Sequence, residues 1–187
     1  YEERCMQTVN ALRLRGHTVH VLTSDHSVEG RDASGEKAIF RRLKVHGFYG
    51  HPWLPIHQLY PLEQANQKAM QALIEELQPD VVHVWNMGGI SKSLLHTLEQ
   101  AKRPVVYDIS DHWIARSLKA DVWLSWWNDS GSIMRKTLRS VATITGLRKA
   151  ISAKVPTASV RSLQFKHIYF CSRYMRDTTA QQGYPVS

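Results

Sequence analysis

The hydrophobic positions at the start of the chain predict a helix followed by a strand. Within residues 2–15, apolar side chains recur at helical spacing and form one stripe of Cys5, Met6, Val9 and Leu12. Gly16 suits the left-handed position that ends a helix, and residues 19–24 have the apolar, β-branched character of a buried strand. A helix, a glycine and a strand in quick succession make half of a βαβ unit, so the pattern predicts a strand before Tyr1.

The same alternation continues along the chain. Short apolar runs predict further strands near residues 39–45, 81–85, 105–109 and 167–171. Apolar residues at helical spacing predict helices over residues 62–77, 94–101 and 173–182. Ser172 is the predicted N-cap of the last helix, and Gly183 is predicted to end it. Strands that alternate with helices through short connections predict an α/β fold, a Rossmann-like doubly wound parallel sheet with helices on both faces.

Three segments lie outside this alternation. Residues 26–37 are polar and contain glycines, which indicates a loop. Residues 46–61 are rich in glycine, proline and aromatic residues and predict an irregular loop, which either serves function or covers an edge of the core. Within residues 111–166 the pattern leaves helix and loop open around three tryptophans, and then predicts a helical stretch that breaks at Gly146.

Composition narrows the class of protein. The 187 residues suffice for one domain with a sizeable core, and 43% hydrophobic with 21% charged residues is ordinary for a globular protein. No apolar run is long enough to span a bilayer. Cys5 and Cys171 give no disulfide framework, which favours a reducing, cytoplasmic compartment. The ten histidines show no metal-ligand spacing on a predicted helix, so we expect no metal site.

The net charge of +8 favours an anionic partner, such as a phosphate, a nucleic acid or an acidic membrane surface. No nucleic-acid-binding motif is present, so we expect no nucleic acid. Basic residues intersperse with apolar ones in a segment that contains Arg135, Lys136, Arg139, Arg148 and Lys149. This segment either contacts an anionic membrane or is a solvated basic face, and the nearby tryptophans are either interfacial or core residues.

Two predicted turns are candidates for a ligand site, because doubly wound sheets bind ligands beyond the carboxyl ends of their strands. The first contains Asn86, Gly88 and Gly89, whose backbone N–H groups either approach a ligand or only permit a tight turn. The second contains Asp111 and His112. Asp111 either orients an acceptor hydroxyl and takes its proton, or caps a helix that begins at His112.

Four stretches together resemble the N-terminal domain of a family 4 glycosyltransferase with the GT-B fold. They are "LRLRGHTVHVLTSD", "PDVVHVWNMGGIS", "RPVVYDISDHW" and "IYFCSRYMRDTTAQQGYP". They occur in the family's order and extend over nearly the whole chain. The family often has a histidine followed by an aspartate or glycine after the strand near 105–109. Here Ser110 occupies the histidine position, Asp111 is retained and His112 follows it.

The resemblance implies that residues 1–187 are one Rossmann-like domain, the acceptor-side half of a two-domain enzyme. Its first strand and the donor-binding domain with paired glutamates would lie outside the chain, which would be inactive alone. The implied reaction is retaining sugar transfer from a nucleotide-sugar to a hydroxyl acceptor, a glycan or lipid-linked molecule, without metal or cofactor. Asp111 and His112 would be catalytic, and Asn86, Gly88, Gly89 and Ser110 would bind the acceptor. The implied location is cytoplasmic or peripheral at the inner membrane face. The alternative is a non-catalytic module on the same fold that binds a glycan, a lipid or a partner.

Overall fold

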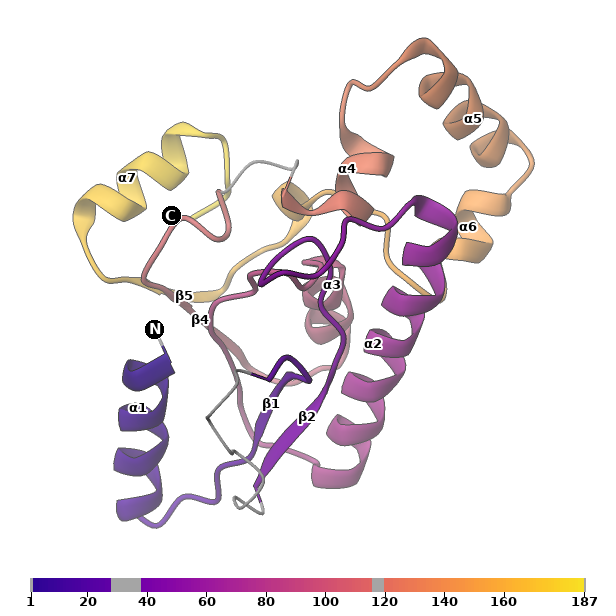
Figure 1. Ribbon diagram of the computed structural model, residues 1–187. Helices are drawn as coiled ribbons and strands as arrows, with labels where there is room; N and C mark the ends of the chain where they lie inside the picture. Colours follow the sequence, from indigo (N-terminus) through magenta and orange to yellow (C-terminus); the bar gives the residue numbers. More distant parts are fainter. Residues whose placement is uncertain (1, 28–37, 116–119, 187) are drawn as a thin grey trace.

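A computed structural model describes residues 2–27, 38–115 and 120–186 of the chain (Figure 1). The strands are β1 (Val21–Ser24), β2 (Ile39–Leu43), β3 (Val82–Val84), β4 (Val105–Ile109) and β5 (His167–Phe170). The helices are α1 (Glu2–Leu14), α2 (Ile56–Leu77), α3 (Ser93–Gln100), α4 (Val122–Asn128), α5 (Ile133–Ile144), α6 (Leu147–Ser152) and α7 (Arg173–Gln181), and η2 (Val160–Ser162) is a short 3-10 helix. All five predicted strands are therefore present.

The strands pair in parallel, and helices lie on both sides of them, with α2 and α3 on one side and α1 and α7 on the other (Figure 1). The predicted Rossmann-like α/β class is confirmed. The strands form two ladders, however, β1–β2 and β3–β4–β5, and not one continuous sheet. The expectation of a single sheet was wrong for the described residues, because β1 bonds only to β2 there and β3 only to β4.

Helix α2 begins earlier than its sequence pattern indicates. The predicted loop over residues 46–61 ends at Pro55, and Ile56 starts a helix that continues through Pro61. Proline lacks the N–H group of a helix interior and normally interrupts the pattern, which is why the prediction placed the start at residue 62. Burial offsets this loss, because Leu59 has no exposed surface and the ring of Tyr60 stacks on Trp123 with 5.8 Å between centroids.

The segment that the sequence left open is helical where it is described, because α4, α5 and α6 lie in it. Gly146 has φ of 75° at the junction of α5 and α6, which confirms the predicted break. The α4 tryptophans Trp123 and Trp127 are 1% and 4% exposed and belong to the core. Most of the predicted loop over residues 26–37 lies outside the described residues.

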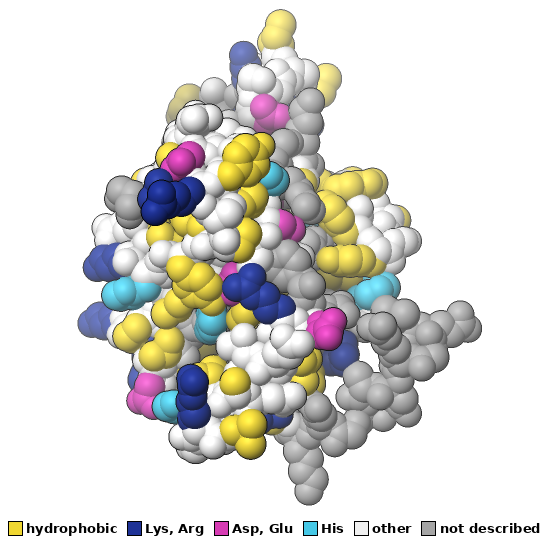
Figure 2. Space-filling model, turned by 90° about the vertical axis from the view of Figure 1, so that its left-hand side faces the viewer, with side chains coloured by type: hydrophobic (Ala, Val, Ile, Leu, Met, Phe, Trp, Pro, Cys, Tyr) yellow, Lys and Arg dark blue, Asp and Glu magenta, His cyan; other side chains and the backbone are white. Residues whose placement is uncertain are grey.

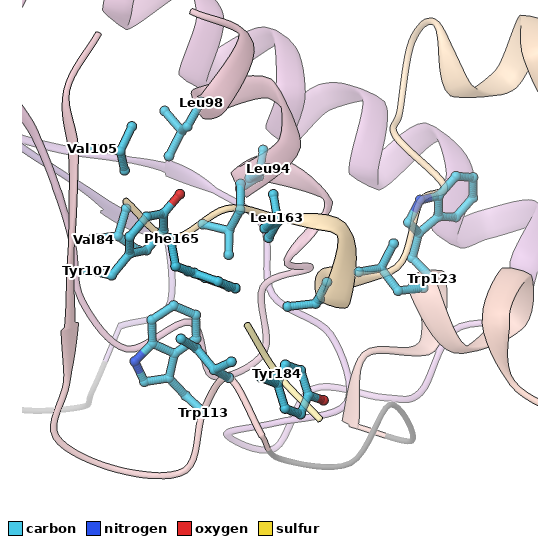
Figure 3. Close-up of a cluster of buried hydrophobic side chains, with 14 of the residues drawn as sticks. Val84, Leu94, Leu98, Val105, Tyr107, Trp113, Trp123, Leu163, Phe165 and Tyr184 are labelled. Atoms are coloured by element: carbon cyan, nitrogen blue, oxygen red, sulfur yellow. The ribbon is translucent and has the colours of Figure 1, made fainter. Parts of the chain in front are cut away.

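The hydrophobic core lies between the β3–β4–β5 sheet and the α2–α3 layer. Alternate residues of β4, Val105, Tyr107 and Ile109, point into it, and α3 contributes leucines from the other side (Figure 3). The rings of Phe165 and Tyr107 pack in a T-shaped arrangement with 4.9 Å between centroids, and Trp113 fills the space beyond the end of β4. The even-numbered positions of β4 therefore face the opposite layer, which contains α1.

Candidate functional site

The turn after β3 is held by its own polar groups. Asn86 Oδ1 accepts a hydrogen bond from the Gly88 N–H at 3.0 Å, and the Gly89 carbonyl accepts one from the His46 N–H at 3.3 Å. Gly89 has φ of 75°, and a Cβ at Gly88 would lie 2.9 Å from Tyr49 Oη. These glycines thus let the segment of residues 46–52 approach the turn closely, and Asn86 shapes it.

The turn after β4 is anchored in the core. The Trp113 N–H donates to Asp111 Oδ1 at 2.7 Å, and the Trp113 indole N–H donates to the Asp108 carbonyl at 3.1 Å. Trp113 is 2% exposed and Ile114 is 1% exposed, so this turn sits on packed side chains. Asp111 caps a turn here, because the described residues 113–115 adopt a turn instead of an α-helix. Among the described residues, His112 Nδ1 is buried without a hydrogen-bond partner.

A buried carboxylate that the sequence reasoning missed lies below Ser110. Asp108 has no exposed surface, and its Oδ1 accepts a hydrogen bond from the Ser110 hydroxyl. Its Oδ2 accepts from the Tyr169 hydroxyl at 2.7 Å and lies 4.0 Å from Arg4 Nη2. Arg4 Nη1 also donates to Ser110 Oγ at 3.0 Å. The N-terminal turn of α1 and β5 are thus joined to the end of β4 by one charged group.

His83 extends this network to β3. Its Nε2 lies 2.8 Å from Tyr169 Oη, and because that hydroxyl donates to Asp108, the His83 ring N–H donates to the tyrosine oxygen. Burial lowers the pKa of His83, against the smaller opposing effect of Asp108. Burial and the bond to Asp108 raise the pKa of Tyr169, and burial followed by the Asp108 charge raises the pKa of the Cys5 thiol. Near neutrality His83, Tyr169 and the Cys5 thiol are therefore uncharged, and Arg4 is the cation that faces the carboxylate.

A hollow of about 360 Å³ opens beyond the carboxyl end of β1. It is lined by Asp25, His26, Ser27, Tyr49, Gly50, His51 and Pro52. His26 Nδ1 and His51 Nε2 lie 3.2 Å apart, and Asp25 pairs with Lys44. Tyr49 connects this hollow to the Gly88 turn. The predicted long loop thus borders the ends of two strands, and β4 adjoins the second of them.

The predicted basic residues lie elsewhere, in and beside α5 and α6. Arg139 Nη1 donates to the carbonyls of Trp127 at 3.0 Å and Asp129 at 2.7 Å, and Arg148 donates to Thr157. The face over α1 and α7 mixes hydrophobic, basic, acidic and histidine side chains (Figure 2). The structure therefore places the predicted site residues in three segments: the turn after β3, the turn after β4 and the α5–α6 segment.

Comparison with protein families identifies the fold's relatives. The model of the glycosyl transferase 4-like domain matches residues 1–163, which is most of the chain and includes both candidate turns. The chain belongs to this family. It is therefore a glycosyltransferase-family module, as the resemblance indicated, and three of the four resembling stretches lie within the matched residues, whereas the fourth, residues 168–185, lies beyond them. No curated protein and no solved structure gives a match.

Residues 2–27, 38–115 and 120–186 contain neither a cluster of metal ligands nor a helix that could span a membrane. In that part of the chain, no group of three His, Cys, Asp or Glu side chains is arranged to hold a metal ion. None of the helices there has the length and apolar character that a membrane crossing requires.

Proposed function

We propose that this chain is the acceptor-side domain of a retaining glycosyltransferase that moves a sugar from a nucleotide-sugar to a hydroxyl acceptor. The observation that supports this best is the anchored turn after β4, which holds the Asp111 carboxylate at the carboxyl end of a parallel strand in a glycosyl transferase 4-like domain. Ligands of such sheets bind at this edge. A carboxylate there suits the orientation and deprotonation of an attacking hydroxyl.

The neighbouring groups have separate roles in this proposal. His112 follows Asp111 and places an imidazole in the same turn. Ser110 is bonded to Asp108 and Arg4 and so connects the turn to α1. The Asn86–Gly89 turn and the hollow beside Tyr49 would accommodate the rest of the acceptor. The nucleotide-sugar would be held by a second domain, and the proposal includes no metal or cofactor.

The test is turnover of the Asp111→Asn variant in the full-length enzyme, measured as nucleotide release from a panel of UDP- and GDP-sugars with glycan and lipid-linked acceptors. Asparagine keeps the oxygen that accepts the Trp113 N–H, so the melting temperature should stay unchanged. We expect turnover to fall by about 10²–10⁴-fold, as for a lost acid–base group. Asp177→Asn, on the exposed face of α7, is the matched control.

Near-normal turnover of Asp111→Asn would remove this carboxylate from the reaction and restrict its role to the turn. The alternative is a non-catalytic binding module. It would be supported if no nucleotide-sugar is turned over but a glycan or lipid binds in an equilibrium binding experiment. The hollow lined by His26, Tyr49 and His51 is the observation that favours that alternative. We also propose that the 187-residue chain alone releases no nucleotide, because its sequence has no candidate for the donor-side paired glutamates.

A further inference from the structure

Helix α5 exposes its apolar side chains. Ile133, Met134 and Ile144 are 84%, 74% and 85% exposed. Leu138, Val141 and the first residue of α6, Leu147, are all more than half exposed. Ala142 is the one buried residue of α5. A surface helix normally buries its apolar stripe, so α5 and α6 present the reverse of the usual arrangement.

The residues of α5 that face the rest of the molecule fix the orientation of this helix. At about 100° per residue, the apolar side chains from Ile133 to Ile144 occupy an arc of about 140°, and Ala142 and Arg139 lie beyond its edge. Arg139 is anchored by its bonds to the carbonyls of Trp127 and Asp129, at the end of α4. The apolar arc consequently points away from the body of the molecule, from which α5 projects (Figure 1).

The side chains of α5 and α6 themselves carry charge of a single sign. Between Asp129 and Asp177 the sequence contains no aspartate or glutamate. Five of the ten basic residues in this stretch lie in α5 and α6, namely Arg135, Lys136, Arg139, Arg148 and Lys149. Lys136, Lys149 and Lys154 are exposed on or just after the two helices. An exposed apolar arc on two helices that contain basic residues and no carboxylate complements an anionic, apolar partner.

We propose that α5 and α6, residues 133–152, dock on an anionic lipid bilayer. The 12 residues of α5 measure about 18 Å, too short to cross a bilayer but suited to lie in its interface. The apolar arc would enter the headgroup–acyl boundary, and the exposed lysines would contact lipid phosphates. This docking does not depend on sugar transfer, so it stands or falls separately from the proposed function.

The first test is flotation of the chain with vesicles of phosphatidylcholine alone or mixed with phosphatidylglycerol. We expect binding to the anionic vesicles only, weakened when salt is raised from about 0.1 M to about 1 M, because the Debye length shortens from about 10 to about 3 Å. The double variant Met134→Glu/Ile144→Glu should bind at least about tenfold more weakly, since two buried apolar contacts are lost. Leu14→Glu/Tyr174→Glu changes equally exposed residues of α1 and α7 and should bind like the parent chain.

The second test changes charge alone. Lys136→Glu should weaken binding about fivefold or more, the effect of one basic residue near an anionic surface, whereas Lys68→Glu on the exposed face of α2 should not. Equal binding to both vesicle types, or none to either, would overturn the proposal. So would a concentration-dependent dimer in light scattering that Met134→Glu/Ile144→Glu abolishes, because the arc would then serve a second copy of the chain.

Discussion

At the end of β4 a carboxylate with no exposed surface is surrounded by hydrogen-bond donors, whereas on α5 an isoleucine is 85% exposed. Both arrangements cost free energy in a monomer, but in different ways. Burying Asp108 removes its hydration, which its hydrogen bonds and Arg4 replace within the fold. Exposing Ile144 leaves an unfavourable apolar surface that nothing in the described chain covers. Groups within the fold therefore compensate for the burial of Asp108, whereas only a binding partner would cover Ile144.

This difference predicts how substitutions will act in the two regions. Side chains at the carboxyl end of β4 should contribute to the free energy of unfolding, because they contact several elements at once. Side chains on the α5 arc should contribute almost nothing to it.

Trp113→Ala should cause the largest loss. Trp113 is 2% exposed, fills the core beyond β4 and fixes the Asp111 turn with two hydrogen bonds. We expect the free energy of unfolding to fall by about 3–5 kcal/mol, as for other buried aromatic residues replaced by alanine. Chemical denaturation measures this, with Trp113→Phe as a control that keeps most of the volume. A loss below about 1 kcal/mol would mean that the turn is not anchored by packing.

Asp108→Ala should have the next largest effect. It removes the acceptor of both the Ser110 and Tyr169 hydroxyl groups and the charge facing Arg4. We expect a loss of about 2–3 kcal/mol, because hydrogen bonds to a buried charged group are among the stronger ones. Asp177→Ala, at an exposed site, should change stability by less than about 0.5 kcal/mol. Equal effects of the two variants would show that the Asp108 network is dispensable.

Much of the fold was predictable from sequence because it depends on local pattern. The apolar β4 run, the Ser172 cap and the break at Gly146 each follow from residues a few positions apart. Helix α2 was placed too late because Pro61 interrupts that pattern while tertiary burial of Leu59 preserves the helix. Local propensity cannot include such distant contacts.

The candidate site was predictable only in part. Its position followed from strand order, since parallel strands end at one edge, and Asp111 does lie in the turn after β4. The sequence did contain a signal for the buried carboxylate, because Asp108 is an acidic residue inside an apolar strand. Its partners Arg4 and Tyr169 are 104 and 61 residues away, however, and only the register of β4 with β5 and the docking of α1 bring them together. Similarly, periodicity predicted the α5 helix without indicating that its apolar side faces outward.

The stability of the region around Asp108 should depend slightly on pH through His83. Burial lowers the folded-state pKa of His83 below its ordinary 6.5, so the unfolded chain takes up the proton more readily. The stability contribution is therefore present above pH 6.5 and is lost as the pH falls from there through the lowered folded pKa. His83→Gln keeps a donor for Tyr169, and its melting temperature should fall less between about pH 7.5 and 5.5. Part of the dependence of the melting temperature on pH should remain in this variant, because burial also lowers the pKa of His96. Parallel slopes for variant and parent would contradict this.

Ile144→Ser should have the smallest effect on stability and is the most direct test of the contrast between the two regions. With 85% of its surface exposed, Ile144 loses almost no contact when truncated, and serine places a polar group in water at no desolvation cost. We expect the free energy of unfolding to change by less than about 0.5 kcal/mol. Leu95→Ala, at a residue of α3 with no exposed surface, should lose about 2–5 kcal/mol under the same conditions. If Ile144→Ser instead cost more than about 1.5 kcal/mol, the apolar arc would be packed in the folded chain and would not be available to a bilayer. A neutral result would mean that folding does not require an apolar residue at this position, and a function outside the fold would then have to account for it.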